Sequence, residues 1–247
     1  MQVNYYKEYS HHLNCEMEYK VYGHSGKVCI VFPAQDGRFY DYENFKMVDA
    51  LSSFIEEGRL QLWCIDSVDK WSWSLKDGNE SERIELHERW FNYICEEIVG
   101  TIRSRCNYQD RIITTGCSMG ATHALNFFLR RPDIFGGVIA LSGVYNASFF
   151  FPNYHDERIF YNSITDYMAK MPSDHYYLDM YRNSKIMVCI GQGRWEDVGL
   201  GDTRYLDQRF KELNVPAWFD YWGFDVDHDW PWWLKQIPYF MSHMLED

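Results

Sequence analysis

The chain has 247 residues, of which 46% are hydrophobic, and a formal net charge of −12 at pH 7. This length and composition suffice for one large buried core, so we expect a single domain over residues 1–247. The 24 Lys and Arg residues are dispersed, which argues against nucleic acid or an anionic membrane surface as the main partner.

Short apolar runs alternate with segments of helical periodicity along the chain. Residues 3–23 alternate polar and apolar side chains and predict an antiparallel hairpin at a sheet edge. Buried strands are predicted at 27–37, 60–67, 111–118 and 185–193, with weaker ones at 136–143 and 217–223. Helices are predicted at 42–58, 83–105, 121–135 and 203–214. Apolar strands alternating with helices predict an α/β fold, in which helices cover both faces of a mostly parallel sheet.

Residues 144–184 interrupt this alternation. The segment lies between two predicted strands, contains no clear strand of its own and is rich in aromatic side chains. It is too apolar for a disordered loop, and long irregular insertions in compact domains usually serve function. We therefore expect a cap or pocket wall at about 144–184.

Location and cofactors follow from what the sequence lacks. The N-terminus shows no basic start followed by an apolar run, and no stretch approaches the ~18 apolar residues that span a bilayer. The seven cysteines are scattered without a CxxC pair. We expect a reduced, cytoplasmic protein with no metal, no organic cofactor and no membrane partner. The aromatic content of 18% also hints at self-association as a homo-oligomer.

The candidate nucleophile is Ser118, in the pentapeptide Gly116-Cys117-Ser118-Met119-Gly120. A Gly-x-Ser-x-Gly sequence between a buried strand and a helix is typical of a nucleophile elbow, a tight turn that projects the serine. Cys117 is the intrinsically better nucleophile. The elbow projects its central residue, however, so Ser118 is the stronger candidate.

A serine nucleophile needs a base and a carboxylate that orients the base. In proteins with this elbow the chain order is serine, acid, histidine. Glu196 and Asp197 follow the strand at 185–193, and His228 follows the last strand. We expect His228 to be the base and one of the two carboxylates to be the acid. His123, five residues after Ser118, is interpreted as a hydrogen-bonded helix residue.

The oxyanion formed on attack needs two N–H donors. The residue after the nucleophile, Met119, supplies one, and the loop after the first buried strand supplies the other, with Gln35 or a neighbour as the candidate. Aromatic residues of the insertion and of the segment 69–75 are expected to line an acyl or aryl pocket. These are Trp71, Trp73, Phe149, Phe150, Phe151, Tyr154 and Tyr161.

Four motifs together resemble the esterase family of α/β hydrolases that includes S-formylglutathione hydrolases, feruloyl esterases and mycolyltransferases. They are VFPAQDGRFYDYEN, GCSMGA, GQGRWED and WGFDVDHDWPWW, and the resemblance runs from about residue 20 to the end. It implies an α/β-hydrolase fold and a serine esterase acting on a small-molecule ester through an acyl-enzyme, with Ser118 as nucleophile and His228 as base. It leaves the acid open between Glu196 and Asp197, with a slight preference for Glu196, because some family members carry the carboxylate three residues after a glycine that would align with Gly193.

Two alternatives remain at this level. One is a different acyl chemistry on the same residues, such as a thioesterase or an acyltransferase. The other is a binding protein that uses the same scaffold without catalysis, because a fold does not by itself imply an activity.

Overall fold

The computed structural model describes residues 1–246, and its strands form one eight-stranded sheet in the order β1-β2-β4-β3-β5-β6-β7-β8. The first two strands pair antiparallel at one edge, β2 is antiparallel to β4, and all the other neighbours are parallel. The predicted edge hairpin and the mostly parallel sheet are therefore confirmed. The strands are β1 (Val3–Ser10), β2 (Cys15–Tyr22), β3 (Lys27–Phe32), β4 (Leu60–Ile65), β5 (Ile112–Cys117), β6 (Phe135–Leu141), β7 (Lys185–Ile190) and β8 (Trp218–Tyr221).

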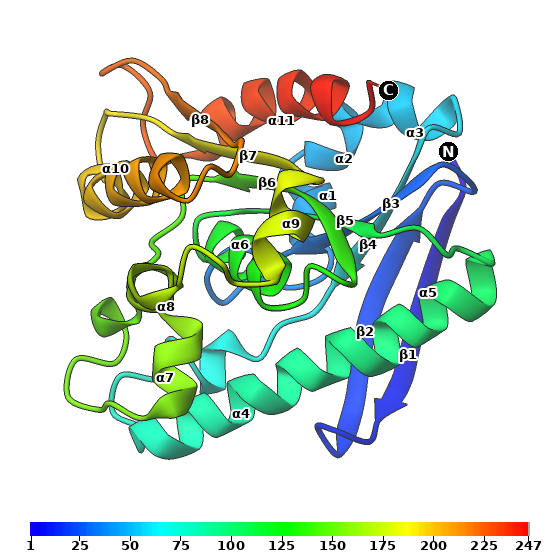
Figure 1. The fold of residues 1–247 in the computed structure, drawn as a ribbon. Helices are drawn as coiled ribbons and strands as arrows, with labels where there is room; N and C mark the ends of the chain where they lie inside the picture. The colour runs from blue at the N-terminus through cyan, green and yellow to red at the C-terminus, as the bar shows by residue number, and fades with distance from the viewer. Residues whose placement is uncertain (247) are drawn as a thin grey trace.

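Helices cover both faces of this sheet, as Figure 1 shows. One face is covered by α1 (Asp41–Asn44), α2 (Met47–Ala50), α3 (Ser52–Glu56) and α11 (Trp230–Met244). The other is covered by α4 (Glu80–Asn92), η2 (Tyr93–Ile98), α5 (Val99–Cys106), α6 (Met119–Arg130) and α10 (Asp197–Glu212). Alternate residues of one strand enter different cores, so that Ile112 packs on one face and Ile113 on the other.

Two predicted helices differ in their continuity. The helix predicted at 83–105 is a single rod, with the π-helical turn η2 between α4 and α5 (Figure 1). The helix predicted at 42–58 is divided into α1, α2 and α3, and Lys46 has a left-handed φ of 67°. Tyr42 and Leu51 both enter the same core. Nine residues make about two and a half turns, so a straight helix would place these two side chains on opposite sides.

The segment 144–184 contains η3 (Ala147–Phe149) and three short helices, α7 (Glu157–Asn162), α8 (Ile164–Lys170) and α9 (Tyr177–Arg182). Its start is fixed to the body of the fold. Asp202 of α10 accepts hydrogen bonds from the amides of Tyr145 and Asn146 at 2.8 and 2.9 Å, and the Thr122 hydroxyl donates to the Val144 carbonyl at 2.8 Å. A role of this segment as a cap stays a prediction.

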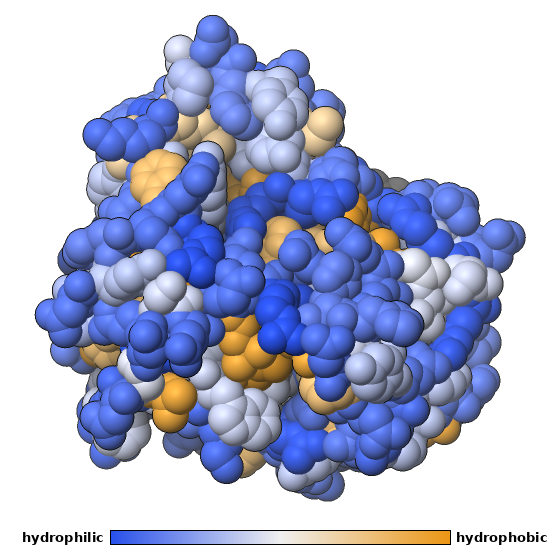
Figure 2. Space-filling view, turned by 90° about the horizontal axis from the view of Figure 1, so that it is seen from below, coloured by the Kyte–Doolittle hydropathy of each residue, from blue (hydrophilic) through white to orange (hydrophobic). Residues whose placement is uncertain are grey.

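The outer surface is mostly polar on the face seen in Figure 2, where apolar residues form small patches in a central hollow and at scattered places around it. Within residues 1–246, none of the helices combines the length and the apolar character needed to cross a lipid bilayer.

Candidate active site

Ser118 lies at a strained turn between β5 and α6. Its backbone angles are φ 57° and ψ −123°, and its amide donates to the Leu141 carbonyl at 2.9 Å. A Cβ on Gly116 would lie 2.4 Å from the backbone of Gly120, and a Cβ on Gly120 would lie 2.4 Å from the Phe32 carbonyl oxygen. Only glycine fits at either position, because the strand, the turn and the helix pass so close to one another. The predicted strand–turn–helix geometry around Ser118 is therefore present.

The structure brings Ser118, His228 and Glu196 into one hydrogen-bonded chain. Ser118 Oγ lies 2.8 Å from His228 Nε2, and His228 Nδ1 lies 3.0 Å from Glu196 Oε2. An ionised carboxylate can only accept hydrogen bonds, so Nδ1 carries the proton and Nε2 is free to accept from the serine hydroxyl. This is the tautomer that a general base requires.

The Glu196 carboxylate is 1% exposed and is held by groups other than the histidine. Its Oε1 accepts hydrogen bonds from the Ser142 hydroxyl at 2.7 Å and from the Gly191 amide at 3.1 Å. The Trp233 indole N–H in turn donates to Ser142 Oγ at 3.1 Å, and its ring packs edge-on against His228. Ser142 follows β6, Gly191 follows β7 and Trp233 lies in α11. No local sequence signal indicated these residues, because they come from different elements.

Asp197, the other candidate acid, lies elsewhere. It is the first residue of α10 and its side chain is exposed. Glu196 precedes the helix as its N-cap residue and points inward. The geometry thus selects Glu196 as the carboxylate that contacts His228.

The loops that carry Glu196 and His228 are fixed to each other. The His228 amide donates to the Arg194 carbonyl at 3.0 Å, and the Arg194 guanidinium pairs with Asp227 at 2.9 Å. The hydrogen bonds from the Arg194 backbone and side chain lower the pKa of the Asp227 carboxyl. Asp227, which flanks His228, therefore serves to hold the loop in this structure.

Cys117 does not share the setting of Ser118. Its side chain is 2% exposed, and burial raises the pKa of its thiol well above the usual value. A thiol in these surroundings is a poor source of thiolate.

Two backbone amides were predicted to bind the oxyanion. Met119 is the first residue of α6, so its amide has no acceptor within the helix. Gln35 is exposed on the loop that follows β3, and the close contact of Gly120 with Phe32 brings the start of α6 against the start of this loop. Their roles in binding an oxyanion stay predictions.

The predicted pocket aromatics lie in three settings: a buried cluster next to the elbow, the exposed surface, and a separate cavity. Phe150 and Tyr154 pack against the buried cluster of Trp73, Met119 and Phe151, next to the elbow. Trp71, which belongs to η1 (Asp69–Trp71), and Phe149 are 59% and 60% exposed.

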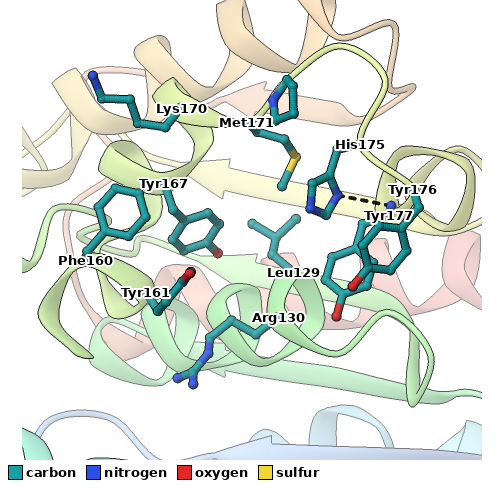
Figure 3. Close-up of a pocket in the computed structure, with 11 residues that line it drawn as sticks. Leu129, Arg130, Phe160, Tyr161, Tyr167, Lys170, Met171, His175, Tyr176 and Tyr177 are labelled. Atoms are coloured by element: carbon teal, nitrogen blue, oxygen red, sulfur yellow. Dashed lines mark hydrogen bonds between the residues drawn. The ribbon is translucent and has the colours of Figure 1, made fainter. Parts of the chain in front are cut away.

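Tyr161 instead lines a separate cavity of about 440 Å³ (Figure 3). Leu129 also lines it, and Leu129 lies about 16 Å along α6 from the elbow. Figure 3 shows rings on two sides of this cavity: Phe160, Tyr161 and Tyr167 on one, and His175, Tyr176 and Tyr177 on the other. The predicted contact of Tyr161 with the substrate at the Ser118 site stays a prediction.

His123 is a buried structural histidine, as interpreted from the sequence. Its Nε2 bonds Asp69 at 2.9 Å, and both side chains are fully buried. The His87 ring stacks on it at 5.3 Å. Burial, with smaller effects of His123 and Arg130, lowers the pKa of His87 well below its ordinary value, so His87 is neutral.

The comparisons with known proteins agree on one family and one fold. The model of the family described as "Putative esterase" matches residues 10–243. A search of curated protein sequences finds no match. Among solved structures, a ferulic acid esterase superposes with a TM-score of 0.77 at 17% identity, covering 99% of this chain and 98% of that one.

Two further structures cover almost all of this chain. An S-formylglutathione hydrolase from Agrobacterium tumefaciens has a TM-score of 0.76 at 14% identity, with coverage of 98% and 94%. The fluorophosphonate-binding serine hydrolase F of Staphylococcus aureus has a TM-score of 0.75 at 15% identity, with coverage of 100% and 99%. At these identities the likeness establishes the α/β-hydrolase fold.

Proposed function

The chain belongs to the putative esterase family and is a serine hydrolase acting on ester bonds, and from this premise we propose that Ser118, His228 and Glu196 form its catalytic triad. The observation that carries the proposal is the continuous chain of hydrogen bonds from Ser118 Oγ through both ring nitrogens of His228 to Glu196 Oε2. The substrate is a small-molecule carboxylic ester, and neither metal nor organic cofactor takes part.

Acylation begins when Ser118 Oγ attacks the ester carbonyl and His228 Nε2 takes the hydroxyl proton. Glu196, held by Ser142 and Gly191, stabilises the imidazolium that forms. The Met119 amide and an amide at or near Gln35 bind the oxyanion. His228 then gives its proton to the alcohol oxygen, the carbon–oxygen bond breaks, and the alcohol leaves an acyl group on Ser118.

Deacylation repeats these steps with water. His228 removes a proton from water, the hydroxide attacks the acyl-enzyme, and the carboxylic acid leaves as Ser118 regains its proton. A thioester in place of the ester, or an acceptor alcohol in place of water, would react through the same steps. Rates on a matched oxygen ester, thioester and amide, and product analysis with added alcohol, separate these chemistries.

We extend the proposal to the whole chain: residues 1–247 form a single domain, and residues 144–184 act as its cap. Phe149 and Phe150 follow β6, at the sheet edge that carries Ser118, and Tyr154 packs on the same buried cluster as Met119. Trp71 lies two positions before Trp73, which belongs to that cluster. We propose that these four aromatic residues contact the substrate. Cytoplasmic location and homo-oligomerisation stay predictions.

The test measures kcat and kcat/KM for short-chain p-nitrophenyl esters in the wild type and in matched variants. Ser118→Ala and His228→Ala are expected to lower kcat by about 10⁴-fold or more, and Glu196→Gln by about 10²–10⁴-fold. The matched control Asp197→Asn, which changes the neighbouring exposed carboxylate, is expected to retain wild-type activity. Equal losses in Glu196→Gln and Asp197→Asn, or full activity in Ser118→Ala, would contradict the proposed triad.

A further inference from the structure

Trp195 combines a strained backbone with an exposed side chain. Its φ is 65°, in the left-handed region, and 67% of its surface is exposed. A bulky residue is a true outlier at such a φ, because its Cβ crowds the carbonyl of its own peptide unit. Burial in the core cannot explain why an indole occupies this position. Residues held in such conformations cluster at functional sites, where the surrounding structure enforces them.

The backbone of Trp195 is fixed directly beside His228. The residue before it, Arg194, accepts a hydrogen bond from the His228 amide, and the residue after it, Glu196, bonds the His228 ring. The Arg194 guanidinium lies 5.4 Å from the centre of the indole while it pairs with Asp227. Both neighbours of Trp195 therefore fix this loop to His228, and the indole is exposed to solvent.

The role of His228 indicates which part of the ester lies near Trp195. In the proposed mechanism His228 gives its proton to the alcohol oxygen, so the alcohol must leave next to the His228 ring. The acyl group, by contrast, stays bonded to Ser118. Trp195, whose backbone neighbours both contact His228, therefore lies on the side of the site from which the alcohol portion of the ester leaves.

We propose that Trp195 is a specificity-determining residue, whose indole binds an aromatic ring in the alcohol portion of the ester. This inference rests on the proposed function. A neutral ring is the partner that an indole face suits best, because stacked and edge-on aromatic pairs gain stabilisation beyond the area that they bury. It defines a substrate class, the carboxylic esters of aromatic alcohols.

The test compares benzyl acetate with ethyl acetate. Both esters produce the same acetyl-enzyme, so any difference between them arises in binding and acylation. The wild type is expected to prefer benzyl acetate, and Trp195→Ala is expected to lower the benzyl-to-ethyl ratio of kcat/KM by about 3–10-fold. Trp195→Phe should restore most of the ratio, because it restores an aromatic face.

Two further variants separate stacking from stability. Trp195→Gly removes both the ring and the left-handed strain, so it should unfold at a higher temperature than Trp195→Ala and still lack the benzyl preference. Tyr176→Ala is the matched control, because Tyr176 is also 67% exposed but lines the separate cavity. Its benzyl-to-ethyl ratio should equal that of the wild type.

Two results with these acetates would overturn the proposal. One is a wild type that does not prefer benzyl acetate. The other is a benzyl-to-ethyl ratio that Trp195→Ala leaves unaltered, which includes an equal loss of kcat/KM on both acetates. Ethyl phenylacetate carries its ring on the acyl side, so Trp195→Ala should lower its kcat/KM no more than that of ethyl acetate. A selective loss of kcat/KM on ethyl phenylacetate would also overturn the proposal, because it would place Trp195 on the acyl side. Hydrolysis of ethyl acetate that survives Ser118→Ala would instead reject the triad, independently of Trp195.

Discussion

At the scale of single residues, Glu196 is distinguished from Asp197 by the backbone around it. The left-handed φ of Trp195 turns the chain so that Glu196 points inward and Asp197 begins α10. The sequence indicated two adjacent carboxylates, but the choice between them depends on backbone angles that residue types do not specify. Ser142 was missed for a related reason, since it reaches Glu196 from the end of β6, 54 positions away along the chain.

Ser142 provides a prediction at this scale. Ser142→Ala removes the hydroxyl that donates to Glu196 Oε1, and a hydrogen bond to a charged group contributes about 1.5–3 kcal/mol. If that stabilisation serves to position the acid, kcat should fall roughly 10–100-fold. Ser10→Ala is the matched control, because Ser10 is also a buried serine whose hydroxyl donates to a glutamate, Glu97, at 3.3 Å.

Steady-state kinetics and urea unfolding together check this prediction. Ser10→Ala should lose stability while it keeps its kcat, and Ser142→Ala should lose kcat at a temperature where it is fully folded. Equal kcat values in the two variants would show that Ser142 has no role in positioning Glu196.

At the scale of secondary-structure elements, the start of α6 lies so close to the end of β3 that position 120, two residues after Ser118, requires glycine. The pattern of apolar residues predicted all the strands: alternation indicated the edge hairpin of β1 and β2, and apolar runs indicated the strands that follow. It did not predict the short helices α7, α8 and α9, which span two turns or less and show no sustained period. It also missed the interruption at Lys46, which only the packing of Tyr42 and Leu51 on one core explains.

Two glycine substitutions in helices test this packing. Gly120→Ala places a methyl group 2.4 Å from the Phe32 carbonyl oxygen and should lower the free energy of unfolding by about 1–3 kcal/mol or more. Gly201→Ala, in α10, meets no atom within 4 Å and should raise it by about 0.5–1 kcal/mol. Urea unfolding measures both, and a neutral Gly120→Ala would mean that the elbow has room to relax.

At the scale of the whole molecule, the sheet brings together residues that the chain separates. Ser118 follows β5, Glu196 follows β7 and His228 follows β8, and the carboxyl ends of parallel strands lie at one sheet edge. The Gly-x-Ser-x-Gly motif, the chain order of serine, acid and histidine, and the positions of the predicted strands together allowed the site to be predicted. The same rule does not reach contacts made through long insertions, such as the cavity that Tyr161 lines with Leu129.

The central claim is that Ser118 is the catalytic nucleophile of this protein, and active-site labelling tests it most directly. A fluorophosphonate reagent phosphonylates only a serine that a base has activated. After digestion and mass spectrometry, we expect one modified residue, Ser118, with no labelling of Ser118→Ala and strongly reduced labelling of His228→Ala. An unlabelled wild type, or a label on another residue that survives Ser118→Ala, would contradict the account.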